Sequence, residues 1–243
     1  MRTLGIDLAS QSSNTALCIL DWGDKQVVVS ELVVGVSDAD ILDAARRCDV
    51  VGIDAPFGWP QPFVEFIRGD PALPRSFPLW TNSYRDRLRF RRTDFATQAL
   101  LGRWPLSVSS DLIAITAMRC AGLLSELGVV DRSGDGRVFE VYPAAALNAW
   151  GLPSSKYRLE LEVMIQRLQC QCSWLKLSHE ISSACVRSHH AFDALVSSLV
   201  ARAASLDLVI HPDDDETELA KTEGWIAIPV VDSLGRLFES STR

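Results

Sequence analysis

The sequence lacks any long uninterrupted apolar run. The longest stretch, at 27–36, is broken by Ser30, Glu31 and Gly35, and no run approaches the roughly 20 apolar residues that a membrane-spanning helix needs. The first residues carry Asp7 and no apolar core of the kind that a secretory signal requires. We therefore expect a cytoplasmic protein with no membrane partner.

Paired cysteine motifs are also lacking. The chain has six cysteines, but none forms a C-x-x-C pair, and Cys170 and Cys172 are separated by a single residue. That spacing fits neither a zinc knuckle nor a thioredoxin-type redox motif. We expect reduced and mostly buried thiols, as is usual in cytosolic proteins.

Basic side chains are in the minority, with 24 lysines and arginines against 31 acidic residues and a net charge of −7. This balance argues against a protein that coats nucleic acid through a global positive field. It leaves open an enzyme with a local basic track and an acidic metal site. Twenty of the basic residues are arginines, which suit phosphate recognition, although genomic base composition explains the excess equally well.

The length of 243 residues, 47% of them hydrophobic, is enough for one large domain with its own core. We expect a single domain over residues 1–243, with an insertion at 56–108 and a C-terminal extension at 207–243. The insertion holds seven of the eleven prolines. We expect it to be irregular with short helices, one of them at Gln61–Arg68, and a structured excursion of this length is usually functional.

Hydrophobic patterning predicts the order of the elements. Three short strands at 3–8, 15–20 and 26–34 form an antiparallel meander, followed by a helix at 38–47 capped by Ser37 and a buried strand at 48–54. Further along, we expect helices at 111–127, ended by Gly128, at 154–168 and at 189–206, capped by Ser188. We also expect a strand at 137–142 and a final edge strand at 224–230. This order predicts an α/β fold of the ribonuclease H-like type, with a mixed five-stranded sheet flanked by helices and an insertion after the fourth strand.

Four acidic residues stand out by their positions. Asp7 and Asp54 end two strands that should be parallel neighbours, where open α/β sheets bind ligands. Glu140 lies inside an apolar strand, and Asp193 interrupts an apolar helix beside His190. Taken singly, each has a plainer explanation: a turn residue for the two aspartates, a solvent-facing position for Glu140, and a structural hydrogen-bond acceptor for Asp193.

Taken together, the four carboxylates predict a metal site. Each pair at 5 Å would repel by roughly 3 kcal/mol at an effective dielectric constant near 20, so the cluster needs cations or protons to persist. Oxygen-only ligation suits Mg²⁺ or Mn²⁺. We expect two ions bound by Asp7, Asp54, Glu140 and Asp193, with Asp7 bridging them, because a pair of ions stabilises both the attacking and the leaving oxygen of a phosphodiester displacement.

Several strings in the sequence also resemble a known family. Gly-Ile-Asp-Leu-Ala, Gly-Ile-Asp-Ala-Pro, Arg-x-Thr-Asp, Phe-Glu-Val-Tyr-Pro, His-His-Ala-Phe-Asp-Ala-Leu and Glu-Gly-Trp-Ile-Ala-Ile-Pro follow one another between residue 3 and about residue 229. They look like the family of predicted nucleases with a ribonuclease H fold that is known as domain of unknown function 429. The resemblance implies a ribonuclease H-like core with an acidic site at Asp7, Asp54, Glu140 and Asp193.

Substrate contacts are expected from the insertion. On an extended segment, Arg85, Arg87, Arg89 and Arg91 would point the same way and form a track for phosphates, with Arg91 and Arg92 as the contacts. The alternative is a set of surface ion pairs with Asp70, Asp86 and Asp94. Trp59 could stack on a base or simply pack, and we expect supporting roles for His190 and Asp94.

The sequence thus predicts a metal-dependent phosphodiesterase, a nuclease acting on nucleic acid. One rival is a nucleotide-binding phosphotransferase of the actin-like type, because Gly5–Ser10 also resembles the first phosphate loop of that superfamily. Such proteins generally need two cores, and this chain supplies one. The other rival is a non-catalytic binding protein that retains the fold.

Overall fold

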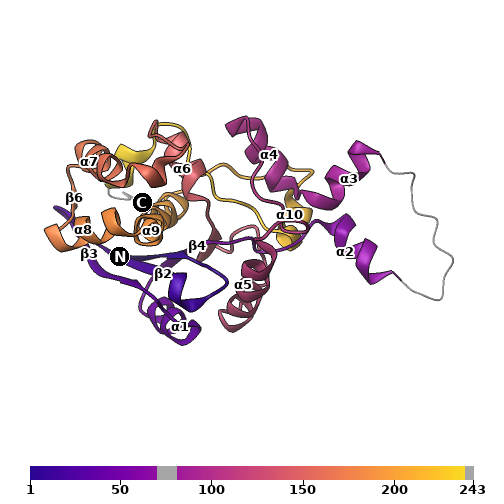
Figure 1. The fold of residues 1–243 in the computed structure, drawn as a ribbon, viewed down its shortest axis with the longest axis horizontal. Helices are drawn as coiled ribbons and strands as arrows, with labels where there is room; N and C mark the ends of the chain where they lie inside the picture. Colours follow the sequence, from indigo (N-terminus) through magenta and orange to yellow (C-terminus); the bar gives the residue numbers. More distant parts are fainter. Residues whose placement is uncertain (70–80, 239–243) are drawn as a thin grey trace.

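The computed structural model describes residues 1–69 and 81–238. Its centre is a six-stranded mixed sheet in the order β5-β4-β1-β2-β3-β6 (Figure 1). The strands are β1 (Arg2–Asp7), β2 (Ala16–Trp22), β3 (Val27–Val34), β4 (Val50–Asp54), β5 (Val138–Glu140) and β6 (Leu175–Lys176). β2 is antiparallel to β1 and β3, whereas β4 is parallel to β1 and β5 is parallel to β4.

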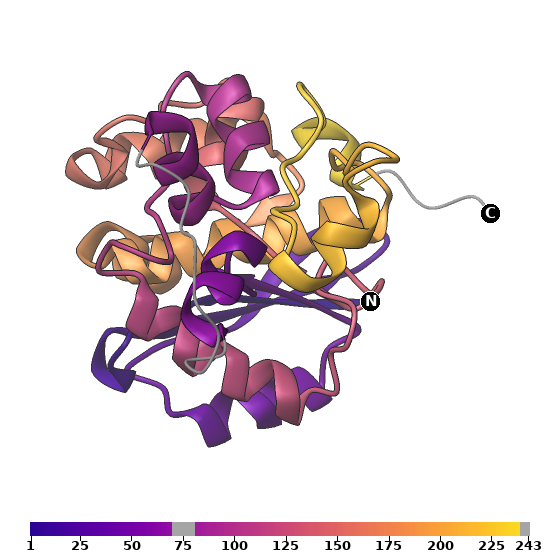
Figure 2. The ribbon, with the colours of Figure 1, turned by 90° about the vertical axis from the view of Figure 1, so that its right-hand side faces the viewer.

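Helices cover both faces of this sheet (Figure 2). One face packs against α9 (His189–Ser205), together with α6 (Pro143–Ala149), α7 (Leu161–Gln171) and α8 (His179–Arg187). The other face packs against α1 (Asp38–Arg46) and α5 (Ala114–Glu126). The apolar core is therefore divided by the sheet into two layers.

The contact between α9 and the sheet is unusually close. A Cβ atom added at Gly5 would lie 2.1 Å from the backbone of Ala194 and Ser198, and one added at Gly52 would lie 2.7 Å from the backbone of Ser197. Glycine is therefore required on β1 and β4 for α9 to approach them. This close approach brings the first turns of α9 beside the carboxyl ends of the two strands.

The insertion after β4 is more regular than the sequence predicts. It contains α2 (Gln61–Arg68), as expected, and also α3 (Asn82–Arg89) and α4 (Arg92–Leu101). Figure 1 shows α2 and α3 at the end of the molecule away from β6, with α10 (Thr217–Glu223) between α2 and the sheet. Residues 70–80, which include the expected ion-pair partner Asp70, lie outside the described residues.

Several expected elements are confirmed. Ser37 caps α1 in a capping box with Asp40, and the hydroxyl of Ser188 caps α9. Gly128 follows the end of α5 with a φ of 72°, as a helix-stopping glycine should. The antiparallel meander of the first three strands and the parallel pairing of the fourth and fifth are also present.

Other expectations are corrected. The sheet has a sixth strand, because Leu175–Lys176 pairs with β3. The segment 224–230 is not an edge strand: it makes only two isolated bridges, Glu140 with Ile226 and Val209 with Pro229. The expected helix at 154–168 is divided into a 3-10 turn (Tyr157–Leu159) and α7, because Lys156 has a φ of 56° and Glu160 leaves the helical region.

The expected extended arginine track is also wrong, because Arg85, Arg87 and Arg89 lie on helix α3, where Arg87 points away from the face that Arg85 and Arg89 share. In the part of the chain that the structure describes, no helix is both long and apolar enough to cross a membrane.

Candidate functional site

Asp7 and Asp54 lie side by side at the carboxyl ends of β1 and β4. They are Cα partners in the parallel register of the two strands, so their side chains leave the same face of the sheet. That face is the one covered by α9, because Gly5 and Gly52, two residues earlier on each strand, contact α9. The pairing that the strand ends predict is therefore present.

His190 joins this pair from the first turn of α9. Its Nδ1 atom lies 2.6 Å from Oδ2 of Asp7. Because an ionised carboxylate only accepts hydrogen bonds, Nδ1 carries the hydrogen and, in the neutral ring, Nε2 is left as the proton acceptor. The imidazole therefore contacts Asp7 directly, and its supporting role stays a prediction.

Asp54 has no such partner. Within residues 1–69 and 81–238, no hydrogen bond or ion pair reaches its carboxylate. Burial raises the pKa of Asp54 well above its ordinary value, and the negative charges of Asp7 and Asp193 raise it further. The positive charge of Arg158 opposes these effects without cancelling them, so the ionised form of Asp54 is disfavoured.

Asp193 lies close to Asp7 and Asp54, but both of its carboxylate oxygens already accept hydrogen bonds. It is wholly buried on α9 and accepts hydrogen bonds from the hydroxyl of Tyr157 and from Nη2 of Arg158, each at 2.7 Å. Burial raises the pKa of Asp193 to about 6, against the opposing effect of Arg158. Both oxygens of Asp193 are engaged, which leaves this carboxylate less available as a metal ligand than the sequence suggests.

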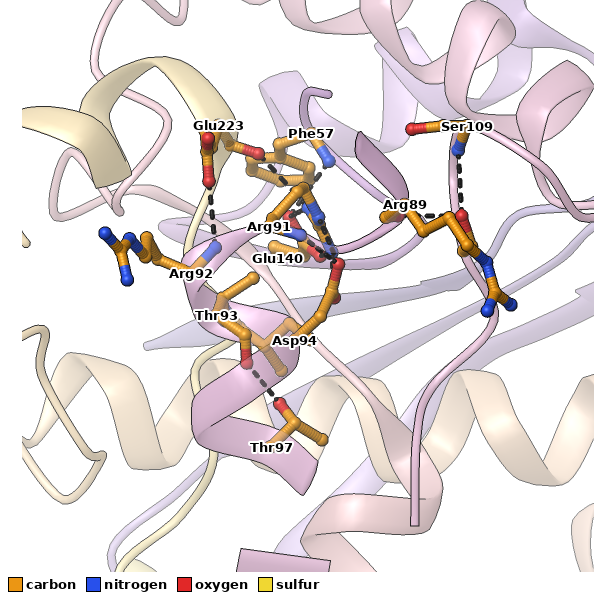
Figure 3. Close-up of polar contacts among 12 residues, drawn as sticks. Phe57, Arg89, Arg91, Arg92, Thr93, Asp94, Thr97, Ser109, Glu140 and Glu223 are labelled. Atoms are coloured by element: carbon orange, nitrogen blue, oxygen red, sulfur yellow. Dashed lines mark hydrogen bonds and ion pairs between the residues drawn. The ribbon is translucent and has the colours of Figure 1, made fainter. Parts of the chain in front are cut away.

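Glu140 points to the opposite face of the sheet. Its Cα partner on β4 is Ile53, one residue before Asp54, so the alternation of side chains along β4 separates the two carboxylates. There Glu140 accepts hydrogen bonds from Arg91, which donates to both carboxylate oxygens at 2.8 Å (Figure 3). The backbone N–H of Phe57 also donates to Glu140. Burial raises the pKa of Glu140 even though Arg91 opposes this effect.

Arg91 is itself buried and directed inward. Besides Glu140, it donates to both oxygens of Asp94 and to the backbone carbonyl of Glu223 (Figure 3). These bonds use all five N–H groups of the guanidinium. Arg91 and Asp94 therefore belong to an internal ion-pair network that joins α4 and α10 to the end of β5. Asp94 is one of the partners expected in the ion-pair alternative, but the pair is buried rather than at the surface.

The other expected substrate contacts lie outside this network. The backbone N–H of Arg92 donates to Glu223, while its exposed side chain borders a second cavity, of about 560 Å³, among α2, α3, α4 and α10. Trp59 is half-buried in the segment between β4 and α2. The structure does not bring either of them to Asp7 and Asp54.

A cavity of about 430 Å³ opens at the Asp7–Asp54 pair. Its lining includes most of the expected site residues: Asp7, Asp54, Arg91, Asp94, Glu140 and His190. It also includes four residues that the sequence analysis missed, namely Arg103, Tyr142, Tyr157 and Arg158. Tyr142 lies within the Phe-Glu-Val-Tyr-Pro string, which was a usable signal, whereas the two arginines are isolated in sequence and carried none.

The four carboxylates do not form one common ligand set. Among the described residues, no group of three or more histidine, cysteine, aspartate or glutamate side chains is placed to hold a metal ion. Glu140 leaves the opposite face of the sheet and pairs with Arg91, and Asp193 pairs with Arg158. Asp7 and Asp54 remain as the pair open to a cation. Binding of two Mg²⁺ or Mn²⁺ ions stays a prediction.

Comparison with known families identifies the family of this chain. The model of a family of proteins of unknown function, DUF429, matches residues 5–217. The chain belongs to this family. The match covers β1 to the start of α10 and so includes all the residues of the Asp7–Asp54 cavity except Ile226. A search of curated proteins finds no match to this chain.

Proposed function

We propose that this member of the DUF429 family is a metal-dependent phosphodiesterase that hydrolyses nucleic acid at the Asp7–Asp54 pair. The observation that carries the proposal is the position of these two carboxylates, in register at the carboxyl ends of two parallel strands and open to a cavity. Parallel strand ends are the usual ligand-binding edge of α/β sheets.

The strand order supports the proposal. β5-β4-β1-β2-β3, with β2 antiparallel to its neighbours, is the order expected for the ribonuclease H-like layout, and β6 is an addition at the far edge. In that layout β1 and β4 are central neighbours, so acidic residues at their ends are brought together by topology. Fold alone does not determine activity, and the argument therefore depends on the side chains.

The donor set fits one hard divalent cation. Asp54 is a partly buried carboxylate with no partner among the described residues, and Asp7 is bonded only to His190. Mg²⁺ is commonly held by one or two carboxylates, with water and substrate phosphate oxygens completing its shell. A bound Mg²⁺ or Mn²⁺ ion would supply Lewis-acid polarisation of a phosphoryl oxygen. We propose Asp7 and Asp54 as its protein ligands.

Glu140 and Asp193 take other roles in this proposal. A second ion bound by either of them would have to displace Arg91 or Arg158 from a carboxylate. Glu140 instead holds the start of α4 against the sheet. His190 orients Asp7 through Nδ1, and its Nε2 can accept a proton during the reaction. A cytoplasmic location and a nucleic-acid substrate belong to the same proposal.

The test is cleavage of a panel of single- and double-stranded DNA and RNA with Mg²⁺ or Mn²⁺. Asp7→Asn and Asp54→Asn should each lower the rate by about 100-fold or more, because each removes a charged ligand of the ion. Asp24→Asn, at an exposed turn, is the matched control and should cleave like wild type. Equal cleavage by all four proteins, or no metal-dependent cleavage by wild type, would overturn the proposal.

A further inference from the structure

The cavity that contains the two aspartates also has a basic side. Arg103, Arg158 and Tyr142 line it, and they come from three segments: the residues after α4, the 3-10 turn before α7, and the junction of β5 with α6. The electrostatic surroundings of the Tyr142 hydroxyl include both arginines as well as Asp54 and Asp193. These groups therefore lie close together, although they are far apart in sequence.

The guanidinium of Arg158 is bonded through Nε and Nη2, whereas Nη1 is available to a ligand. Its Nη2 donates to Asp193 at 2.7 Å and its Nε contacts the Tyr157 hydroxyl at 3.4 Å. Asp193 is wholly buried, whereas the Arg158 side chain is 51% exposed. No partner of Nη1 is found within the described residues. One edge of the guanidinium thus remains available while the other is fixed by a buried carboxylate.

Arg103 is held differently. Its Nη2 donates to the backbone carbonyl of Ser154 at 3.0 Å, and in the described part of the chain it has no acidic partner. The Tyr142 hydroxyl, on the same cavity lining, likewise makes no hydrogen bond to any described residue. Each of these three side chains therefore keeps at least one N–H or O–H group without an acceptor among the described residues.

We propose that Arg103, Arg158 and Tyr142 form a binding site for a single phosphate group, and that Asp193 is the positioning residue that holds Arg158 in it. Guanidinium groups donate paired hydrogen bonds to phosphate oxygens, and a tyrosine hydroxyl adds a third donor. That the bound phosphate is part of the substrate rests on the proposed function, whereas the proposal that this site binds phosphate does not depend on it.

The role of Asp193 has a distinctive consequence. If Asp193 acts only through its charge, its replacement by asparagine removes a negative charge beside the cavity and strengthens anion binding. If it positions Arg158, the same replacement weakens the anchor and so weakens anion binding. The two roles predict opposite signs. Tyr157→Phe removes the other hydrogen bond of the same carboxylate and the long contact from Arg158 Nε, but it leaves the bond between Arg158 and Asp193 in place.

The experiment is calorimetric titration of the full chain with the dinucleotide TpT and, separately, with inorganic phosphate, both in EDTA. Arg158→Gln and Arg103→Gln should each weaken binding about tenfold or more, since each removes a charged donor. Asp193→Asn should also weaken it, and Tyr157→Phe should weaken it less than Asp193→Asn, because Arg158 keeps its bond to Asp193. Arg46→Gln, at an exposed position on α1, should bind like wild type.

Unchanged binding in Arg158→Gln, or tighter binding in Asp193→Asn, would overturn the inference. Arg158→Gln keeps the test decisive if Asp193→Asn does not fold, because the Arg158 side chain is half exposed. Binding of TpT assigns the site to a phosphodiester, and binding of inorganic phosphate alone supports a phosphate site separate from the proposed function. Because no metal or cleavage is involved, failure of this site and failure of the phosphodiesterase proposal are distinguishable.

Discussion

Arg91 and Glu140 form a buried two-point ion pair, in which Nη1 and Nη2 each donate to one carboxylate oxygen at 2.8 Å. Both side chains are only 3% exposed. The pair connects the residue before α4 to the last residue of β5, so it fastens the insertion to the edge of the sheet (Figure 3). A carboxylate at a strand end is either paired with an arginine, as Glu140 is, or unpaired among the described residues, as Asp54 is, and its replacement should affect stability in opposite directions in the two cases.

Replacing Glu140 by glutamine should destabilise the protein by about 3 kcal/mol, because it leaves the buried Arg91 charge with only Asp94 as an acidic partner. The free energy of unfolding in urea measures this. Glu31→Gln, which breaks the exposed pair with Arg47, is the control and should cost less than about 1 kcal/mol. A Glu140→Gln protein that is as stable as wild type but no longer binds Mn²⁺ would instead identify Glu140 as a ligand.

Replacing Asp54 by asparagine should stabilise the metal-free protein by about 1–2 kcal/mol at pH 8, because it removes the cost of burying a charge and, in addition, the repulsion from Asp7. The pKa of Asp54 is raised in the folded state, so the folded protein disfavours the ionised form. This penalty is complete above the folded pKa and absent below about pH 4, where the carboxyl is protonated in both states.

The gain from Asp54→Asn should therefore disappear as the pH falls, and thermal melting at several pH values follows it. Mn²⁺ should raise the melting temperature of wild type and have little effect on the variant. A lower melting temperature for the variant at pH 8 would show that Asp54 makes a stabilising contact instead.

Replacing Gly5 by alanine should prevent stable folding. The new Cβ would lie 2.1 Å from the backbone of α9, and a helix backbone cannot move away without separating from β1. Gly122→Ala is the matched control: on α5 nothing lies within 4 Å of its Cβ, and removing a helical glycine should stabilise by about 0.5–1 kcal/mol. Circular dichroism and thermal melting measure both, and a well-folded Gly5→Ala protein would refute the packing argument.

Replacing His190 distinguishes orientation of Asp7 from proton transfer. Asparagine can still donate a hydrogen bond to Asp7 but cannot accept a proton as Nε2 does, whereas alanine can do neither. If His190 transfers a proton, both variants should lower the cleavage rate by about 100-fold or more. Near wild-type cleavage by His190→Asn, with loss in His190→Ala, would limit the residue to orienting Asp7.

The acidic pair illustrates what could be predicted locally. Asp7 and Asp54 each follow an apolar strand segment, and the parallel pairing of two such strands brings their ends together. Glu140 also lies at a strand end, but its face depends on register. A shift of one residue, pairing it with Ile53 rather than Asp54, moves it to the other side of the sheet. No local pattern specifies that register.

The arginines illustrate the opposite case. Alternate arginines from Arg85 to Arg91 are typical of one face of a strand, yet Thr81 caps a helix here, which turns Arg87 away from Arg85 and Arg89. Arg91 then leaves the helix and is buried, while Arg103 and Arg158, which have no neighbours of their kind in sequence, reach the cavity. Their positions follow from how the insertion and the turn before α7 pack on the sheet.

The amino-acid sequence alone determined the order of most of the helices and strands, the caps at Ser37 and Ser188, and the placement of two aspartates at strand ends, because these depend on residues within a few positions of one another. Only the tertiary structure decided which charges meet. Arg91 and Glu140 are 49 residues apart and Arg158 and Asp193 are 35 apart, and such pairs form only when packing and register bring distant segments together.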